Sequence, residues 1–299
     1  MTDTANASKA PIHDGTLFLG IDLGGTNVQI GVVTASGKVL SRAKRKTIAE
    51  EGRDAVLDRI MDGIEEACAE AKVELADSRA VGMGAPGPVD PNTGVVLEAV
   101  NLGWLNEPIA KMLGKRLGLP LYLDNDVNVA VYGEWKMGAA KGATNMMGAW
   151  IGTGVGGGFI LNNALYYGSF LTAGEVGHML VSPENPPGVR SVEHNCSRTA
   201  IAQRITQLVK ANRKSPLADA VNEGKRIKSR VLGDAYKGGD DLVCEVINDA
   251  ADRLGMAIGS IATLLSLEMV VLGGGLTEAL GNPYVNRVRK AAIKSAFPA

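Results

Sequence analysis

The sequence contains few cysteines. They stand at Cys68, Cys196 and Cys244 in a chain of 299 residues. An odd number of widely separated cysteines argues against a disulfide framework and against a Cys-x-x-Cys metal site, since both patterns need paired cysteines. We therefore expect a protein of a reducing compartment, the cytoplasm.

Long hydrophobic runs and an excess of one charge are also lacking. No stretch reaches the roughly eighteen apolar residues that a membrane-spanning helix needs. Residues 1–15 are polar, are interrupted by Pro11 and Gly15 and contain no apolar signal region, so we expect a disordered tail and no secretory signal. The formal net charge of −1 provides no basic surface for nucleic acid or lipid. We expect neither partner.

Glycine, in contrast, is abundant. The chain has 38 glycines, roughly twice the average usage, and they follow no fixed period. Such glycines indicate turns at which the backbone approaches a ligand, above all an anion. The length exceeds one ordinary hydrophobic core, so we expect two lobes.

A first glycine hairpin is predicted near the start of the chain. Apolar strands are expected over residues 17–22 and 28–33, followed by a turn at Ser36-Gly37 and a third strand from Val39. The hairpin reads Asp22, Leu23, Gly24, Gly25, Thr26 and Asn27. Its N–H groups and the Thr26 hydroxyl could bind an anion, and Asp22 could hold Mg²⁺ through water. An ordinary glycine hairpin is the alternative.

The same plan recurs later in the chain. Residues 147–151 are apolar, a glycine turn extends from Gly152 to Gly158, residues 159–161 are apolar again, and a polar turn precedes residues 165–167. Two glycine hairpins from two related lobes could bind a polyphosphate from both sides.

An Asn125-Asp126 pair ends the apolar strand that follows Pro120. Residues 127–137 are predicted to form a helix, so Asp126 lies at a strand-to-helix junction, where a side chain can project into a cleft. We interpret Asp126 as a proton acceptor, and a helix N-cap is the alternative. Gly84-Ala85-Pro86-Gly87-Pro88 is expected to be a rigid positioning loop.

The second half is predicted to be largely helical. A helix should begin at Glu193, two further helices are expected over residues 242–254 and 256–265, and an apolar strand over residues 269–272 should follow. That strand ends in Gly273-Gly274-Gly275, where a flat ring or a ribose could lie against bare backbone, or where the chain simply turns.

Together these motifs resemble the ROK family (repressors, open reading frames and sugar kinases) of the actin, hexokinase and Hsp70 ATPase superfamily. The resemblance rests on the glycine hairpins, Gly84-x-Pro-Gly87, Asn125-Asp126, Ala173-Gly-Glu175-Val-Gly-His178 and Gly273-Gly-Gly275. It implies an α/β, two-lobed actin-like (ribonuclease H-like) fold with a ligand cleft, with lobes at residues 16–125 and 126–299. The strand and helix that usually close the family fold are expected to be missing.

The resemblance further implies a cytoplasmic, homodimeric, ATP- and Mg²⁺-dependent hexokinase of carbohydrate metabolism and glycolysis. Asp126 would be the catalytic base that deprotonates the 6-hydroxyl of a hexose, with glucose as the leading substrate. The expected sugar-binding residues are Asn125, Glu175, His178 and Glu193. The expected nucleotide-binding residues are Asp22, Gly24, Gly25, Thr26, Asn27, Thr153, Gly154, Gly274 and Gly275.

Three alternatives stay open at this point. The substrate could be mannose, fructose, allose or N-acetylmannosamine, and the donor could be polyphosphate. The protein could instead be a sugar-sensing ROK regulator, although the polar residues before the first hairpin are too few for a helix-turn-helix. It could also be a silent sugar-binding protein, against which the intact Asp126 and glycine turns argue.

One departure from the family concerns zinc. Many members carry a cysteine cluster after the Glu-x-Gly-His motif that binds structural zinc. Here a proline-rich loop, residues 183–191, stands in its place, and Cys196 alone cannot supply three thiolates. We therefore expect no structural zinc.

Overall fold

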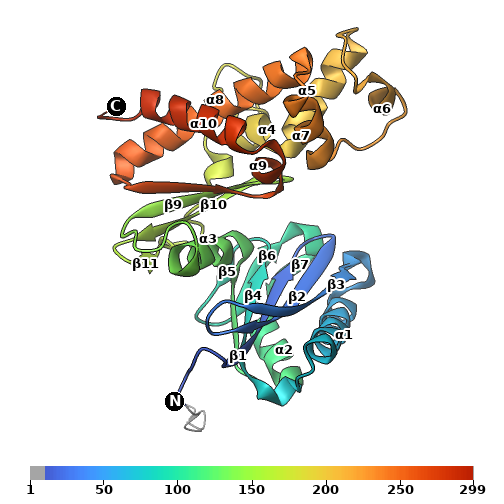
Figure 1. Ribbon diagram of the computed structural model, residues 1–299, viewed down its shortest axis with the longest axis vertical. Helices are drawn as coiled ribbons and strands as arrows, with labels where there is room; N and C mark the ends of the chain where they lie inside the picture. Colours follow the sequence, from blue (N-terminus) through green and yellow to red (C-terminus); the bar gives the residue numbers. More distant parts are fainter. Residues whose placement is uncertain (1–10, 299) are drawn as a thin grey trace. The chain divides into compact units, whose positions relative to one another are not determined.

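The computed structural model describes residues 11–298, which form two compact units (Figure 1). The first unit extends to Val129 and the second begins at Ala130. The lobe boundary expected after Asn125 and this division both fall in the first turn of helix α3 (Asp126–Met137). Residues 1–10 of the expected disordered tail lie outside the described residues.

The first unit is built on a mixed sheet. Its strands β1 (Leu17–Leu23), β2 (Asn27–Thr34) and β3 (Val39–Lys46) form the predicted antiparallel meander. Strands β4 (Ser78–Ala85) and β8 (Leu121–Asn125) lie parallel to β1, in the sheet order β3-β2-β1-β4-β8. Because parallel strands end at the same edge of a sheet, β1, β4 and β8 deliver their last residues to one place.

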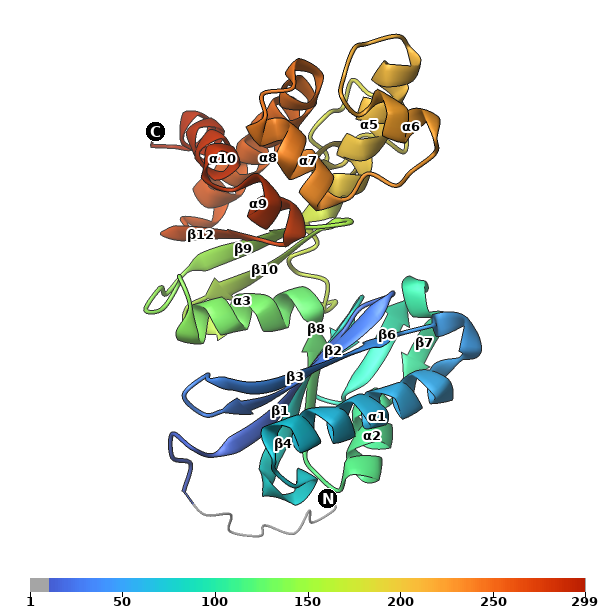
Figure 2. The ribbon, with the colours of Figure 1, turned by 45° about the vertical axis from the view of Figure 1, so that its right-hand side comes forward.

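Helices pack on this sheet and bury its apolar side chains. Helix α1 (Arg53–Ala71) contacts β2 and β3, and α2 (Ile109–Leu117) contacts β8 (Figure 2). Apolar residues recur at helical spacing along α1, and this stripe is buried, with Val56, Leu57 and Ile60 fully inaccessible. The unit also contains the small sheet of β5 (Val89–Asp90), β6 (Val95–Ala99) and β7 (Trp104–Glu107), and the short 3-10 helices η1 (Ala49–Glu51), η2 (Leu75–Asp77) and η3 (Val100–Leu102).

The second unit repeats the strand plan of the first. Strands β9 (Met146–Ile151), β10 (Val155–Leu161) and β11 (Ala164–Leu165) are antiparallel neighbours, and β12 (Met269–Gly273) runs parallel to β9. The predicted repeat is confirmed, although its third strand has only two residues.

The predicted glycine turn is too long, because Gly156, Gly157 and Gly158 belong to β10. A Cβ atom on Gly157 would lie 2.8 Å from the Gly174 carbonyl oxygen. These glycines therefore let a neighbouring loop pack directly on the strand, whereas the turn itself is Gly152-Thr153-Gly154.

Helices make up most of the rest of the second unit. They are η4 (Val176–His178), α4 (Val192–Cys196), α5 (Arg198–Lys210), α6 (Ala218–Asn222), α7 (Ser229–Lys237), α8 (Asp241–Leu265), α9 (Gly275–Leu280) and α10 (Asn282–Ser295). The helix expected from Glu193 onward is two helices, because Ser197 caps α5 by accepting a hydrogen bond from the Ala200 N–H. Glu193 therefore belongs to the separate short helix α4.

The two helices predicted over residues 242–265 are in fact one, α8. Gly255 does not interrupt it. A Cβ atom at this position would lie 2.4 Å from the Ala291 Cβ and 2.5 Å from the Val288 carbonyl oxygen, both in α10. Glycine is needed here because α8 and α10 pack side by side in direct contact (Figure 1).

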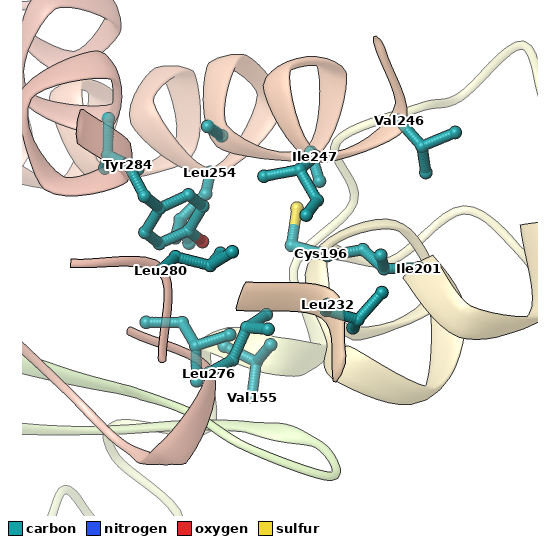
Figure 3. Close-up of a cluster of buried hydrophobic side chains, with 14 of the residues drawn as sticks. Val155, Cys196, Ile201, Leu232, Val246, Ile247, Leu254, Leu276, Leu280 and Tyr284 are labelled. Carbon is teal, nitrogen blue, oxygen red and sulfur yellow. The ribbon is translucent and has the colours of Figure 1, made fainter. Parts of the chain in front are cut away.

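The core of this unit lies between the sheet and its helices. Figure 3 shows part of it, with Cys196, Ile247 and Leu276 among the buried side chains. Burial raises the pKa of the Cys196 thiol to about 12, so this cysteine stays protonated at neutral pH. Across residues 11–298, no helix combines the length and apolar character that crossing a membrane would require.

Candidate functional site

The candidate residues of the first unit meet at the carboxyl edge of its sheet. Asp22 of β1 is opposite Gly84 of β4, and Gly84 is in turn opposite Asp124 of β8. Asp126 follows β8 directly as the first residue of α3. The sheet therefore brings the first glycine hairpin and the Asn125-Asp126 pair to the same edge of this unit.

Asn125 organises the junction between β8 and α3. Its Oδ1 accepts hydrogen bonds from the N–H groups of Val127 (2.9 Å) and Asn128 (3.1 Å), so Asn125 is the residue that caps the helix. Its Nδ2 donates to the Asp126 Oδ1 at 3.0 Å and to the Gly87 carbonyl oxygen at 3.1 Å. Asn125 thus fixes the Asp126 carboxylate, and sequence reasoning missed this role.

Asp126 accepts a second hydrogen bond on the same oxygen. The Val127 N–H donates to Oδ1 at 2.8 Å. Two donors aimed at one oxygen fix the orientation of the carboxylate. A carboxylate held in this way can accept a proton, which is the chemistry that the sequence predicts.

The Gly84–Gly87 segment packs closely around this pair. A Cβ on Gly84 would lie 3.1 Å from the Asp126 Cα, and a Cβ on Gly87, which has φ 82°, would lie 1.9 Å from the Glu98 carbonyl oxygen. Only glycine fits at Gly87, since a side chain there would be both strained and blocked. The prediction of a loop from Gly84 onward is wrong for Gly84 and Ala85, which are the last residues of β4, so the chain leaves the strand only at Pro86-Gly87-Pro88.

Thr47 holds the first glycine turn in place. Its hydroxyl donates to the Gly24 carbonyl oxygen at 2.6 Å, and its N–H donates to the Thr26 carbonyl oxygen at 3.0 Å. Within the turn, the Gly24 N–H donates to the Asn27 carbonyl oxygen at 3.0 Å. These bonds define the backbone of the turn, at which Gly25 and Thr26 are both exposed.

Asp22 stands beside this turn. Desolvation raises the pKa of its carboxyl group, and the hydrogen bond that Gln29 Nε2 donates to Oδ2 at 3.4 Å only partly offsets the effect. A carboxylate penalised by desolvation gains from a nearby cation, which restores the favourable interaction lost with water. Asp22 therefore suits a position near a hydrated divalent cation.

In the second unit, helix α5 supports the turn Gly152-Thr153-Gly154. The Arg198 N–H donates to the Gly152 carbonyl oxygen at 3.0 Å, and its Nη2 donates to the Thr153 hydroxyl at 2.8 Å. The Thr199 hydroxyl donates to the Thr153 carbonyl oxygen at 2.7 Å. In the sequence, the position of Arg198 and Thr199 shortly after Glu193 is their only signal, so sequence reasoning missed their role.

A basic hollow of about 620 Å³ opens beside these two residues. It is lined by Arg198, Thr199, Ala202, Gln203, Thr206, Gln207, Lys225, Arg226 and Ile227. Burial lowers the pKa of Arg198, and the neighbouring Arg226 charge lowers it further. Two guanidinium groups that repel each other at the wall of a hollow gain from an anion placed there.

A second hollow of about 450 Å³ is lined in part by Gly275, Ser229 and Glu278. Gly275 is open to it, because a Cβ there would meet only the Ser229 Oγ, at 4.0 Å. Gly274 has a different reason to be glycine. Its φ is 90°, and a Cβ would lie 2.6 Å from the Ile151 carbonyl oxygen. Of the predicted pair, Gly275 is the residue that lines this hollow.

The predicted sugar-binding residues of the second unit cluster around η4. Glu175 and His178 are exposed, so His178 is not a buried core histidine. Gly177 lies between them, and a Cβ there would lie 3.4 Å from the Glu193 Cβ. The Glu193 Oε2 accepts a hydrogen bond from the Val155 N–H at 2.9 Å, directly after the Gly154 turn. Glu193 therefore lies next to both the η4 segment, which is predicted to bind sugar, and the Gly154 turn, which is predicted to bind phosphate.

No group of three or more histidine, cysteine or acidic residues arranged for a metal ion occurs among residues 11–298. In the proline loop, residues 183–191, the Val189 carbonyl oxygen accepts hydrogen bonds from the side chains of Asn185 and Asn195, both at 3.1 Å.

The comparisons with known proteins agree with this arrangement. The profile of the ROK family matches residues 18–297. A glucokinase from Halalkalibacterium halodurans is 32% identical over 94% of this chain and 86% of that protein. A glucokinase from Thermotoga maritima is 32% identical over 94% of this chain and 88% of that protein.

A solved structure supports the fold prediction as well. The ROK family glucokinase from Streptomyces griseus, in complex with glucose and AMPPNP, has a TM-score of 0.80 and 28% identity, covering 95% of this chain and 90% of that one. The predicted α/β actin-like fold is therefore confirmed. By its profile match, its relatives and its fold, this chain belongs to the ROK family.

Proposed function

We propose that this protein is an ATP-dependent hexokinase that phosphorylates the 6-hydroxyl group of a hexose, with glucose as its preferred substrate. The observation that carries the proposal is the Asp126 carboxylate, oriented by Asn125 at the sheet edge that also holds the Asp22–Asn27 hairpin. Relatives named glucokinase, at 32% identity over most of the chain, support glucose over other sugars.

In this proposal Asp126 is the general base. Its Oδ1 is occupied by the Asn125 Nδ2 and the Val127 N–H, which hold the carboxylate in one orientation. A base so held can accept the proton of the sugar hydroxyl as that oxygen attacks the γ-phosphorus of ATP, and the bond to the β-phosphate oxygen breaks. Phosphoryl transfer needs mainly positioning and charge neutralisation, so one carboxylate is sufficient.

The nucleotide would be bound by backbone turns. Gly24, Gly25, Thr26 and Asn27 in the first unit, and Thr153 and Gly154 in the second, are the proposed phosphate contacts. Arg198 and Arg226 would add positive charge beside the second turn. Gly274 and Gly275 are the proposed contacts of the adenosine, with Gly275 at the wall of the adjoining hollow.

Mg²⁺ would travel with the phosphates of ATP. The raised pKa of Asp22 and its place beside the Gly24 turn fit a carboxylate that holds a hydrated cation. When bound, Mg²⁺ would neutralise phosphate charge and so favour attack by the sugar oxygen.

The sugar would be bound by Glu175, His178 and Glu193, and by Asn125, which would exchange one of its four hydrogen bonds within the chain for one to a sugar hydroxyl. Glu175 and His178 are exposed, and one Glu193 oxygen is left to accept a hydrogen bond from a ligand hydroxyl. A site of carboxylates, an imidazole and an amide rejects sugars that leave these groups unpaired. We also propose that the protein is a cytoplasmic homodimer, as its resemblance to the family implies. Light scattering of the purified protein would test whether it is a dimer.

A coupled phosphorylation assay over glucose, mannose, fructose, allose and N-acetylmannosamine tests the proposal. Each sugar is offered with ATP and, separately, with inorganic polyphosphate, in the presence of Mg²⁺. We expect the highest kcat/KM with glucose and ATP. If the protein transfers phosphate to none of these sugars from either donor, the hexokinase proposal is refuted. Higher activity with polyphosphate than with ATP would identify polyphosphate as the phosphoryl donor.

A further inference from the structure

The loop between η4 and α4 contains the features that lead to a further inference. It connects His178 to Glu193, two proposed sugar-binding residues from different elements. Its two ends are joined by backbone hydrogen bonds, in which the Val192 N–H donates to the Met179 carbonyl oxygen at 2.8 Å and the Val181 N–H donates to the Arg190 carbonyl oxygen at 3.0 Å. Each joined residue lies next to, or close to, a sugar-binding residue in the sequence.

The side chains of two asparagines connect separate parts of this loop by hydrogen bonds. Asn195 in α4 donates from Nδ2 to the carbonyl oxygens of Ser191 (2.8 Å) and Val189 (3.1 Å). Its Oδ1 accepts from the Asn185 Nδ2 at 3.2 Å, and Asn185 Nδ2 also donates to Val189 at 3.1 Å. Arg190 Nε donates to the Asn185 carbonyl oxygen at 2.5 Å. We call Asn185, Arg190 and Asn195 the asparagine clasp.

Arg253 fastens the same loop to the long helix α8. Its Nε donates to Asp249 Oδ2 at 2.9 Å within the helix, while its Nη1 donates to Glu184 Oε1 at 3.3 Å and to the Ser182 hydroxyl. Ser182 is fully buried, and the Arg253 side chain is 25% exposed. A partly buried guanidinium with three partners resists movement of the loop relative to the core.

We infer that the asparagine clasp and Arg253 are positioning residues that fix His178 and Glu193 relative to each other for sugar binding. This inference rests on the proposed function. Within residues 11–298, no side-chain hydrogen bond joins the clasp to the proposed sugar or phosphate residues, so the clasp acts by setting where η4 ends and where α4 begins. The turn Gly152-Thr153-Gly154 is itself held by Arg198 and Thr199, while Glu193 binds only the Val155 N–H that follows the turn.

This separation gives the clasp a distinct kinetic signature. In Asn195→Ala, the two donors to Ser191 and Val189 are lost, so the loop ends loosen and His178 and Glu193 no longer have a fixed spacing. We expect the KM for glucose to rise about tenfold, the effect of losing one to two net hydrogen bonds. The KM for ATP should change less than about twofold, because Arg198 and Thr199 still hold the phosphate turn.

Asn195→Asp is the sharper variant. It preserves the side-chain size and the oxygen that accepts from Asn185, but removes the donors to two carbonyl oxygens. We expect a glucose KM at least as high as in Asn195→Ala. The matched control is Asn286→Ala on α10, an exposed asparagine whose side chain makes no hydrogen bond within residues 11–298; both KM values should equal those of the wild type.

Amide hydrogen exchange provides a readout that does not depend on activity. In Asn195→Ala, the Val181, Ser182 and Val192 amides, which donate across the loop ends, should exchange about tenfold faster, with α5 unchanged. An unchanged glucose KM, an equal rise in both KM values, or unaltered exchange would each overturn the inference. A wild-type protein inactive on every hexose would refute the proposed function instead, and the exchange result would then decide whether the clasp holds the loop.

Discussion

Single residues at the β8–α3 junction decide how the candidate site is organised. Asp at a strand-to-helix junction has two ordinary uses, a helix cap and an acid or base. The cap of α3 is provided by the Asn125 Oδ1, which accepts from two backbone N–H groups. Asn125 therefore takes over most of the capping of α3. The Asp126 Oδ1 accepts hydrogen bonds from the Asn125 amide and the Val127 N–H.

The base role of Asp126 is tested by Asp126→Asn and Asp126→Ala. The asparagine side chain would retain an oxygen for the two hydrogen bonds but could not accept the proton, so we expect kcat to fall about 10²- to 10⁴-fold with the thermal midpoint of unfolding nearly unchanged. The alanine variant should lose the same activity and some stability as well. Glucose affinity, measured by calorimetry, should stay within about tenfold in both. Retention of most of the kcat in Asp126→Asn would exclude Asp126 as the base.

At the scale of whole elements, the structural reason for glycine differs from one position to the next. In the β10 strand it lets a loop pack on bare backbone, at Gly274 it permits a left-handed backbone against β9, and at Gly255 it lets two helices touch. Two of these positions belong to runs of three glycines in the sequence, whereas Gly255 is a single glycine. Only the neighbouring element explains which use applies, because the atoms that a Cβ would strike come from distant parts of the chain.

The packing of α8 on α10 leads to a prediction about stability. Gly255→Ala adds a Cβ that would lie 2.4 Å from the Ala291 Cβ, and we expect a loss of about 1–3 kcal/mol in the free energy of unfolding from overpacking. The matched control is Gly133→Ala in α3, where a Cβ meets nothing within 4 Å and helix propensity should add about 0.5–1 kcal/mol. Urea unfolding of both variants measures the difference. Equal stability changes would contradict the assigned contact.

For the whole molecule, the proline loop raises the question of metal content. We expect purified protein to contain zinc well below one atom per chain, because Cys196 is buried with its pKa raised to about 12 and hydrogen bonds from Asn185, Asn195 and Arg253 close the loop. Elemental analysis after dialysis measures this directly. Activity should return with Mg²⁺ alone after treatment with EDTA, and stoichiometric zinc would show that the loop has been misinterpreted.

Hydrophobic periodicity and turn chemistry in the sequence were sufficient to predict much of the fold. They predicted the repeated meander, the strand before Asn125 and the order of the glycine motifs, since each depends on residues close together in the chain. They failed where long-range packing decides the outcome, as in the unbroken helix α8 and in the separate helix α4 that carries Glu193.

The sequence by itself determined which residue types were available for chemistry, because the motifs around Asp22, Asp126 and Glu175 are local. Tertiary structure alone decided how these residues are held. Asn125 is bound to Gly87, Glu193 to the Val155 N–H, and Thr153 to Arg198, and each pair is far apart in the chain. Hydrogen bonds between such residues form only when the folded sheet and helices bring their atoms within about 3 Å, a distance that no local pattern encodes.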